Sequence, residues 1–317
     1  MSRILVIRND ELDPHVSVAD CMGPVEKSFV AITEGRAELP AKYHDRTPFG
    51  MWFFMGGHSA EDHAMAVKLG CAPAAGVSCQ VIHYDAVTAA PLALMEGLRV
   101  TYLRTGAAAA IGARHLARPD SRVVAVLGAG RVGWYSLIAL KECFDLQKVL
   151  VADAAPEAAR SFAQRGAGVY DFPVEPASLE AATRAADIVI TGTPAREPFV
   201  RDAWVRPGTH ISAMGADTRG KQELDAAIHL RARVVCDYVA QCLKWGDINN
   251  TVADGGLQEG DLVGEIGEVI LGRKPGRTAD DEVTLFDATG MGIQDAVVAK
   301  LIYDTAERVG FGTAVEL

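Results

Sequence analysis

The sequence has no basic block, no long apolar run and few aromatic residues. Its 317 residues carry a formal net charge of −10, and aromatic side chains make up 7 %. Binding to nucleic acid or to an anionic membrane surface requires clustered lysine and arginine, so we expect neither partner. No apolar run approaches the roughly 20 residues of a membrane-spanning helix. The N-terminal segment MSRILVIRNDELD is too short and too charged for a signal peptide, and we therefore expect a cytoplasmic protein.

The sequence also lacks the patterns of disulfide frameworks and metal sites. None of its six cysteines forms a CxxC pair or stands at metal-ligand spacing from a histidine. We therefore predict reduced thiols and no metal. The patterns HExxH and GxSxG are missing as well, so metal-dependent hydrolysis and a serine nucleophile have no support.

One stretch in the middle of the chain combines a short apolar run, residues 123–127, with glycines at Gly128, Gly130 and Gly133. The first glycine permits a tight turn, the second leaves room for a pyrophosphate, and the third lets a helix pack close to the strand. Asp153 follows Gly133 by twenty residues, where a carboxylate accepts hydrogen bonds from a ribose diol and repels a 2′-phosphate. The stretch predicts an NAD site; the alternative is a structural glycine turn in another type of α/β unit.

The residues around this stretch alternate between expected strands and helices, which predicts a doubly wound parallel sheet of Rossmann type, an α/β fold. We expect strands at residues 123–127, 149–152, 168–170, 187–191, 209–214 and 234–237, the last of the series, and helices at 134–143, 156–166 and 178–185. A short helical segment at residues 259–272 and an apolar run at 283–286 follow.

The N-terminal part is different, because its expected strands follow one another without long helices between them. A strand at residues 4–7 and a helix at 17–35, with Ser17 as its N-cap, precede strands at 50–55, 64–69, 77–84 and 91–96 and a helix at 100–117. This spacing predicts an antiparallel sheet. The last helix, residues 290–309, is expected to return to this part. We therefore predict an α+β substrate-binding and dimerisation domain, residues 1–119 with 290–317, and an NAD-binding domain, residues 120–289.

Four charged residues are candidates for chemistry. Lys68 either lies on the exposed face of a strand or, if partly buried, binds a substrate carboxylate or transfers a proton. Arg104, in the first turn of its helix, forms either a salt bridge or a bidentate clamp on a carboxylate. Asp217 follows an expected strand end, where it is either the N-cap of the next helix or a carboxylate in the cofactor cleft. Lys42 is the weakest candidate from the residues alone.

Several segments resemble the ornithine cyclodeaminase/μ-crystallin family, which includes an alanine dehydrogenase branch. They include VTYLRTGAAAAIGARHLARPDSRV, GAGRVG, DIVITGTPAREP, GADTRGKQELD, GEIGEVILGRKPGR and TLFDATGMGIQDAVVAKLIYD, in the family's order over nearly the whole chain. The resemblance implies a Rossmann domain paired with a substrate domain, and a homodimer. The chain departs from the family at residues 70–76, GCAPAAG, where relatives often carry a longer loop near the substrate side chain.

The resemblance also implies roles for individual residues. Lys42, Lys68 and Arg104 match positions that bind the substrate carboxylate, and Lys68 and Asp217 match the catalytic pair. The cofactor positions are matched by Arg104, Thr105, Gly128, Gly130, Arg131, Val132, Asp153, Thr191, Thr193, Met214, Gly215, Lys221 and Thr289.

These roles predict an NAD-dependent oxidoreductase that interconverts a small L-amino acid and its imine or 2-oxo acid, at a site in an interdomain cleft. A hydride would pass between the substrate Cα and the nicotinamide, and Asp217 or a water held by it would move the proton, with help from Lys68. One alternative is an ornithine-cyclodeaminase-type lyase, in which the hydride returns to the product and no NADH accumulates. Another is a non-enzymatic protein that binds NAD or a small ligand.

Overall fold

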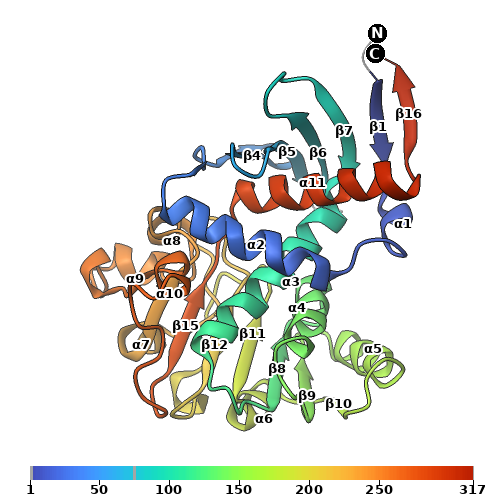
Figure 1. The fold of residues 1–317 in the computed structure, drawn as a ribbon. Coiled ribbons are helices and arrows are strands. Elements are labelled where there is room, and N and C mark those ends of the chain that lie inside the picture. Colours follow the sequence, from blue (N-terminus) through green and yellow to red (C-terminus); the bar gives the residue numbers. More distant parts are fainter. Residues whose placement is uncertain (1–2, 74–75, 317) are drawn as a thin grey trace. The chain divides into compact units, whose positions relative to one another are not determined.

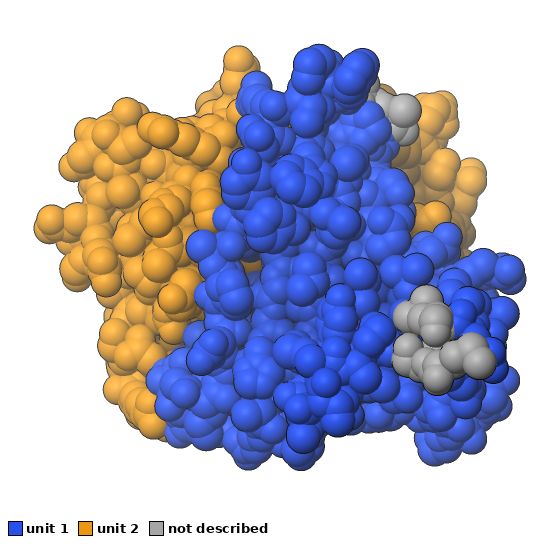
Figure 2. Space-filling view, turned by 90° about the horizontal axis from the view of Figure 1, so that it is seen from above, with its two compact units in different colours: residues 1–107, 291–317 blue, residues 108–290 orange. Residues whose placement is uncertain are grey.

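The computed structural model describes residues 3–73 and 76–316. The chain divides into two compact units, which Figure 2 colours separately: unit 1 comprises residues 1–107 with 291–317, and unit 2 comprises residues 108–290. The predicted domain boundary follows residue 119. The division into units lies earlier, within helix α3 (Gly97–Leu116).

Unit 1 is built on a mostly antiparallel sheet. In the described residues, its strands follow the order β16-β1-β7-β6-β5-β4-β2, and β3 also pairs with β4. Neighbouring strands from β3 to β7 are antiparallel, whereas β1 and β7 are parallel, so the predicted antiparallel sheet is confirmed with this exception. The bounds are Arg3–Ile7 (β1), Ala37–Glu38 (β2), Tyr43–Thr47 (β3), Gly50–Ser59 (β4), Ala64–Pro73 (β5), Ser78–Asp85 (β6), Pro91–Glu96 (β7) and Thr313–Glu316 (β16).

Two long helices belong to unit 1, and both were predicted. Helix α2 (Val18–Thr33) begins after Ser17, whose Oγ accepts a hydrogen bond from the Asp20 amide, so the predicted N-cap is confirmed. Helix α11 (Gly292–Val309) packs against α2, β4 and β5, as Figure 1 shows. Strand and helix backbones approach closely there, because a Cβ added at Gly57 would lie 2.3 Å from the Ile293 amide nitrogen.

Unit 2 is built on a parallel sheet with the strand order β10-β9-β8-β11-β12-β15-β13-β14 among the described residues. The strands are Val123–Leu127 (β8), Lys148–Ala152 (β9), Val174–Pro176 (β10), Ile188–Thr191 (β11), His210–Ala213 (β12), Arg233–Cys236 (β13), Gly264–Glu265 (β14) and Thr284–Asp287 (β15). Their order reverses between β8 and β11, which is where doubly wound sheets bind ligands at the carboxyl ends of the strands. The predicted Rossmann-type α/β fold is confirmed.

Shorter elements complete the chain (Figure 1). They are α1 (Asn9–Leu12), α4 (Arg131–Lys141), α5 (Pro156–Ala167), α6 (Leu179–Ala185), α7 (Ala226–Arg231), α8 (Val239–Trp245), α9 (Asn249–Ala253), α10 (Ile266–Ile270) and the 3₁₀ turns η1 (Asp202–Trp204) and η2 (Glu259–Asp261). Among the described residues, no helix has the length and apolar character needed to cross a membrane.

Several expected elements of unit 2 were wrong or incomplete. The strand expected at residues 168–170 is instead a turn, and the edge strand β10 forms later, from Val174. The helix expected at residues 259–272 is reduced to η2 and α10, because Gly264 between them has a φ of +134° and belongs to β14. β13 is not the last strand, since β15 pairs between β12 and β13.

The segment 70–76 is also different from a simple loop. Residues 70–73 complete strand β5, and Ala74 and Ala75 lie outside the described residues.

Candidate functional site

The glycine turn of unit 2 has the predicted strand–turn–helix form. Gly128 directly follows β8 with a φ of +108°, and Gly130 is the N-cap of α4. A Cβ on Gly133 would lie 2.6 Å from the Gly128 carbonyl oxygen, so this glycine is needed for the helix to approach the strand. In contrast, a Cβ on Gly130 would meet no atom within 4 Å. The space at the N-terminus of α4 is therefore open to a phosphate group.

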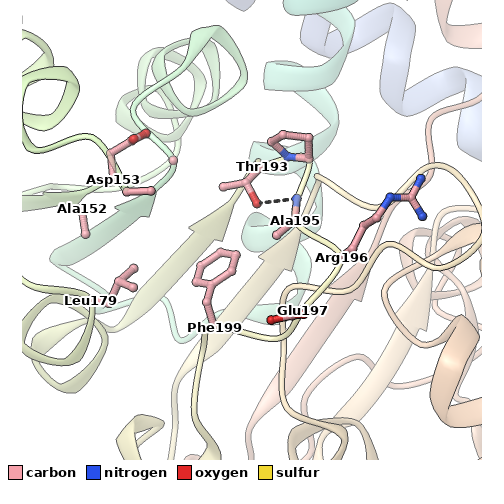
Figure 3. Close-up of a pocket in the computed structure, with 11 residues that line it drawn as sticks. Ala152, Asp153, Leu179, Thr193, Ala195, Arg196, Glu197 and Phe199 are labelled. Carbon is pink, nitrogen blue, oxygen red and sulfur yellow. Dashed lines mark hydrogen bonds between the residues drawn. The ribbon is translucent and has the colours of Figure 1, made fainter. Parts of the chain in front are cut away.

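A pocket of about 540 Å³ adjoins this turn. Figure 3 shows Asp153 and Leu179 on one side of the pocket and Thr193 and Phe199 on the other. Its walls are mainly apolar, while Asp153 adds a carboxylate at the end of β9. Thr193, Arg196 and Glu197 are the other polar residues of its lining. Mainly apolar walls with a few placed polar groups suit a planar base attached to a ribose. The turn and the pocket together fit the adenosine diphosphate part of NAD.

The Asp153 carboxylate is held in place by the backbone. Its two oxygens accept hydrogen bonds of 2.8 Å from the amides of Ala129, in the glycine turn, and Ala155. A carboxylate oxygen accepts more than one hydrogen bond, so a ribose hydroxyl can still donate to Asp153.

Glu223 is a buried acid that the sequence did not single out. Its carboxylate accepts hydrogen bonds from Thr191 Oγ1 at 2.6 Å, from the amide and hydroxyl of Thr193 at 2.7 Å each, and from the Gly215 amide at 3.1 Å. Glu223 thus joins the ends of β11 and β12 at three predicted cofactor positions. Burial, with a contribution from Asp247, raises the pKa of Glu223 to about 7.

Asp247 continues this buried network toward β15. It accepts hydrogen bonds from the Glu223 amide at 2.6 Å and from His229 Nε2 at 2.9 Å, and its own amide donates to Asp287 at 2.9 Å. Burial raises the pKa of Asp287 well above its usual range, and the charge of Asp247 adds to this effect. The polar network therefore links the carboxyl ends of β11, β12 and β15 by hydrogen bonds.

Asp217 does not cap a helix, so that sequence-based alternative was wrong: the next helix, α7, begins at Ala226. The Asp217 side chain is 45 % exposed and accepts a 2.6 Å ion-paired hydrogen bond from Lys221 Nζ. Lys221 also donates to the Gly215 carbonyl at 3.3 Å. Two predicted site residues, one catalytic and one cofactor-binding, are therefore paired with each other.

Unit 1 holds a buried charge cluster around Lys68. The Lys68 side chain is only 3 % exposed, and its Nζ lies 2.8 and 2.9 Å from the two carboxylate oxygens of Asp295. Arg104 Nε lies 3.5 Å from the same carboxylate. The exposed-face alternative for Lys68 was therefore wrong. Arg104 forms the salt bridge that was one of its two alternatives, and its role as a clamp on a substrate carboxylate stays a prediction. Burial lowers the pKa of Lys68, Asp295 opposes this shift, and Arg104 adds to it.

The other predicted residues are mostly buried. Arg131 and Val132 form the first turn of α4, and Thr289 Oγ1 donates to Asp237 at 3.3 Å. Lys42, Thr105, Met214 and Thr289 are each less than 9 % exposed. Within the described ranges, no group of three or more His, Cys, Asp or Glu side chains is arranged to hold a metal ion.

Sequence reasoning missed Asp295 and Glu223. Both lie inside segments that carried the family resemblance, GMGIQDAVVAK and GKQELD. For Asp295 a signal was available. It is an acid among the apolar residues of an expected helix, and a buried carboxylate requires a cationic partner.

The chain matches known proteins over its whole length. The model of the ornithine cyclodeaminase/mu-crystallin family matches residues 4–310. Alanine dehydrogenase of Archaeoglobus fulgidus is 35 % identical over 324 residues, which cover 98 % of each chain.

Two solved structures are similar in fold. One is an archaeal alanine dehydrogenase dimer with bound NAD, which superposes with a TM-score of 0.95 at 34 % identity and 100 % coverage of both chains. The other is Thermococcus litoralis Δ(1)-pyrroline-2-carboxylate reductase in complex with NADH and L-proline. Its TM-score is 0.95 at 32 % identity, covering 98 % of this chain and 100 % of that one.

Proposed function

The chain belongs to the ornithine cyclodeaminase/mu-crystallin family, and on this premise we propose which of its residues carry the reaction. The protein is an NAD-dependent oxidoreductase that interconverts a small L-amino acid and its imine or 2-oxo acid. When bound, NAD accepts or supplies the hydride. We assign the cofactor to the glycine turn and pocket of unit 2 and the substrate carboxylate to the charge cluster of unit 1.

The assignment of the cofactor rests on local geometry. The Gly128–Gly133 turn leaves open space before α4, and the helix N-terminus adds free amides for a pyrophosphate. Asp153 accepts from the ribose diol, and its negative charge disfavours a 2′-phosphate. Thr191, Thr193 and Gly215, fixed by Glu223, complete the dinucleotide site at the ends of β11 and β12.

The assignment of the substrate rests on two buried cations. Lys68 and Arg104 share one carboxylate partner, Asp295, so the three side chains carry a net charge of +1. A buried cationic cluster of this kind attracts a substrate carboxylate and orients it by charge-assisted hydrogen bonds. Lys42 is also buried, and we propose it as a further residue that binds the substrate carboxylate. The Lys68–Arg104 pair is the single observation that carries the substrate class.

Proton transfer is assigned to Asp217. Because its carboxylate is half-exposed, Asp217 can hold a water molecule, and its pairing with Lys221 fixes the side chain. The carboxylate, or the water that it holds, takes up the proton when water attacks the imine and returns it when the imine re-forms. Lys68, whose pKa is lowered by burial, assists as a proton donor.

We also propose a homodimer formed through the outer face of the unit 1 sheet. Residues alternate along β5: Ala66 and Lys68 are buried, whereas Val67 and Leu69 are each 40 % exposed. Trp52 and Phe54 of β4, together with Tyr43, continue this outer apolar face, and the Tyr43 and Phe54 rings stack at 5.1 Å. A contiguous apolar face of this kind is typical of a subunit interface.

The dimer is tested by analytical ultracentrifugation of the wild type and of Leu69→Glu. We expect the wild type to be a dimer and Leu69→Glu to shift toward monomer. A monomeric wild type would contradict the proposal. A cytoplasmic location stays a prediction, based on six cysteines that are all free thiols.

The activity is tested with NADH, ammonia and a panel of 2-oxo acids, and separately with NAD and L-amino acids, following NADH absorbance. Lys68→Ala and Asp217→Asn should each lose turnover while NADH fluorescence still reports binding. The control is Lys300→Ala, which removes a lysine that pairs with Asp304 on the surface of α11. Wild-type rates in the first two variants would refute the assignment. Ammonia release from ornithine without a change in NADH would instead indicate the lyase reaction.

A further inference from the structure

Asp295 stands at the centre of the unit 1 cluster, although the proposed reaction assigns it no role. It lies in the first turn of α11 and is 1 % exposed. Its carboxylate contacts two cations, Lys68 at 2.8 Å and Arg104 at 3.5 Å. An isolated buried carboxylate is strongly unfavourable, so this acid is retained in the interior by its cationic partners.

The hydrogen bonds of Lys68 define a single orientation for its ammonium group. Nζ contacts both oxygens of Asp295 and also donates to Thr101 Oγ1 at 3.2 Å. Thr101 Oγ1 itself donates to the Gly97 carbonyl at 2.8 Å, which leaves the hydroxyl oxygen free to act as an acceptor toward Lys68. An ammonium has three N–H donors and no acceptor, so these contacts match the charged form of Lys68 and not a neutral amine.

We propose that Asp295 is a positioning residue that keeps Lys68 charged and oriented, and that it sets the cluster to accept one carboxylate group. The charge balance of the three side chains in contact supports this: Lys68 and Arg104 with Asp295 leave +1, which a single substrate carboxylate neutralises. Without Asp295 the cluster would carry +2 in a buried environment. This inference rests on the proposed role of Lys68 and Arg104 in substrate binding.

The groups that face Lys68 determine what the loss of Asp295 does. They are Asp295 on α11, Arg104 and Thr101 on α3, and Cys79 on β6. Burial and Arg104 lower the pKa of Lys68, and Asp295 is the main group that raises it. Removal of that negative charge therefore lowers the pKa of Lys68 further.

The test compares the pH profiles of kcat/KM for the wild type, Asp295→Asn and Asp295→Glu, with the best 2-oxo acid of the panel. In Asp295→Asn we expect the alkaline limb of the profile to move down by about one pH unit, with kcat/KM at least tenfold lower. In Asp295→Glu, which keeps the charge, the limb should stay in place although the rate falls. The control Asp304→Asn removes the acid of an exposed Asp–Lys pair on the same helix. It should change neither the position of the alkaline limb nor the value of kcat/KM.

A lower rate in Asp295→Asn without movement of the limb would indicate a structural role only and overturn the proposal. If Asp295→Asn does not fold, the pH profile of Asp295→Glu decides. An alkaline limb that moves down by about one pH unit in Asp295→Glu would overturn the proposal, because this variant keeps the negative charge.

A second measurement separates this inference from the proposed function. The ¹³Cε chemical shift of Lys68, assigned with Lys68→Arg in protein labelled with ¹³C-lysine, reports its protonation without any substrate. Earlier deprotonation of Lys68 in Asp295→Asn than in the wild type supports the inference even if no substrate in the panel is turned over. Equal titration in the two proteins refutes it even if the enzyme is active.

Discussion

The substitution Glu223→Gln tests whether the buried acid of unit 2 controls the pH dependence of stability. The glutamine has nearly the same shape but cannot ionise, and its amide group donates where the carboxylate only accepts. Four donors from Thr191, Thr193 and Gly215 converge on the carboxylate. The substitution therefore affects both the titration of this site and the turns at the ends of β11 and β12.

The magnitude follows from the pKa of Glu223, which burial raises from 4.5 to about 7. Between these values the folded protein holds a proton on Glu223 that the unfolded chain has already released. Stability from this group is therefore complete below pH 4.5 and is lost as the pH rises toward 7. A difference of 2.5 units, 7 minus 4.5, corresponds to about 3 kcal/mol at about 1.36 kcal/mol per unit.

The assay is urea unfolding of the wild type and Glu223→Gln at several pH values from 4.5 to 8. The free energy of unfolding of the wild type should decrease between pH 4.5 and 8. That of Glu223→Gln should decrease by about 3 kcal/mol less over the same range. The control Glu175→Gln alters an exposed acid of the same unit, paired with Lys148, and should follow the wild-type profile. Parallel profiles for the wild type and Glu223→Gln would refute the reasoning.

Three further predictions concern packing, the cofactor and the ion pair. Gly57→Ala should destabilise by about 3 kcal/mol in urea unfolding, because its Cβ meets helix backbone, whereas Gly23→Ala, with no atom within 4 Å, should be neutral or stabilising. Asp153→Ser should weaken NADH binding roughly tenfold and reduce the preference over NADPH, measured by fluorescence titration, since it removes a charge and two backbone hydrogen bonds. An unchanged preference would contradict this. Asp295→Asn leaves two buried cations with an excess charge and should lower the free energy of unfolding by about 3–5 kcal/mol. Lys68→Met should lower it by less, and equal losses would argue against the charge balance.

Much of the proposed cofactor site of unit 2 could be predicted from the sequence because its determinants are close together in the chain. The turn from Gly128 to Gly133 depends on backbone conformation and on the absence of side chains, and Asp153 ends the next strand. Such features act within a few residues of one another, so their spacing alone indicates the geometry. The errors in unit 2, at residues 168–170 and at Gly264, occurred where short elements depend on pairing with distant strands.

The charge cluster of unit 1, which we propose binds the substrate, could be predicted only in part. The resemblance singled out Lys68 and Arg104, but their residue types left open whether they were exposed or buried. Asp295 lies 227 positions after Lys68 and meets it only because α11 returns to pack on β5. Glu223 likewise reaches Thr191 and Thr193 across about 30 residues.

The sequence by itself determined the parallel sheet, the glycine turn and the type of cofactor, since periodicity and glycine spacing act locally. Only the tertiary structure decided which charges are buried together. Folding brings Lys68, Arg104 and Asp295 together and removes water from all three, and in that environment the two cations depend on the opposite charge of Asp295.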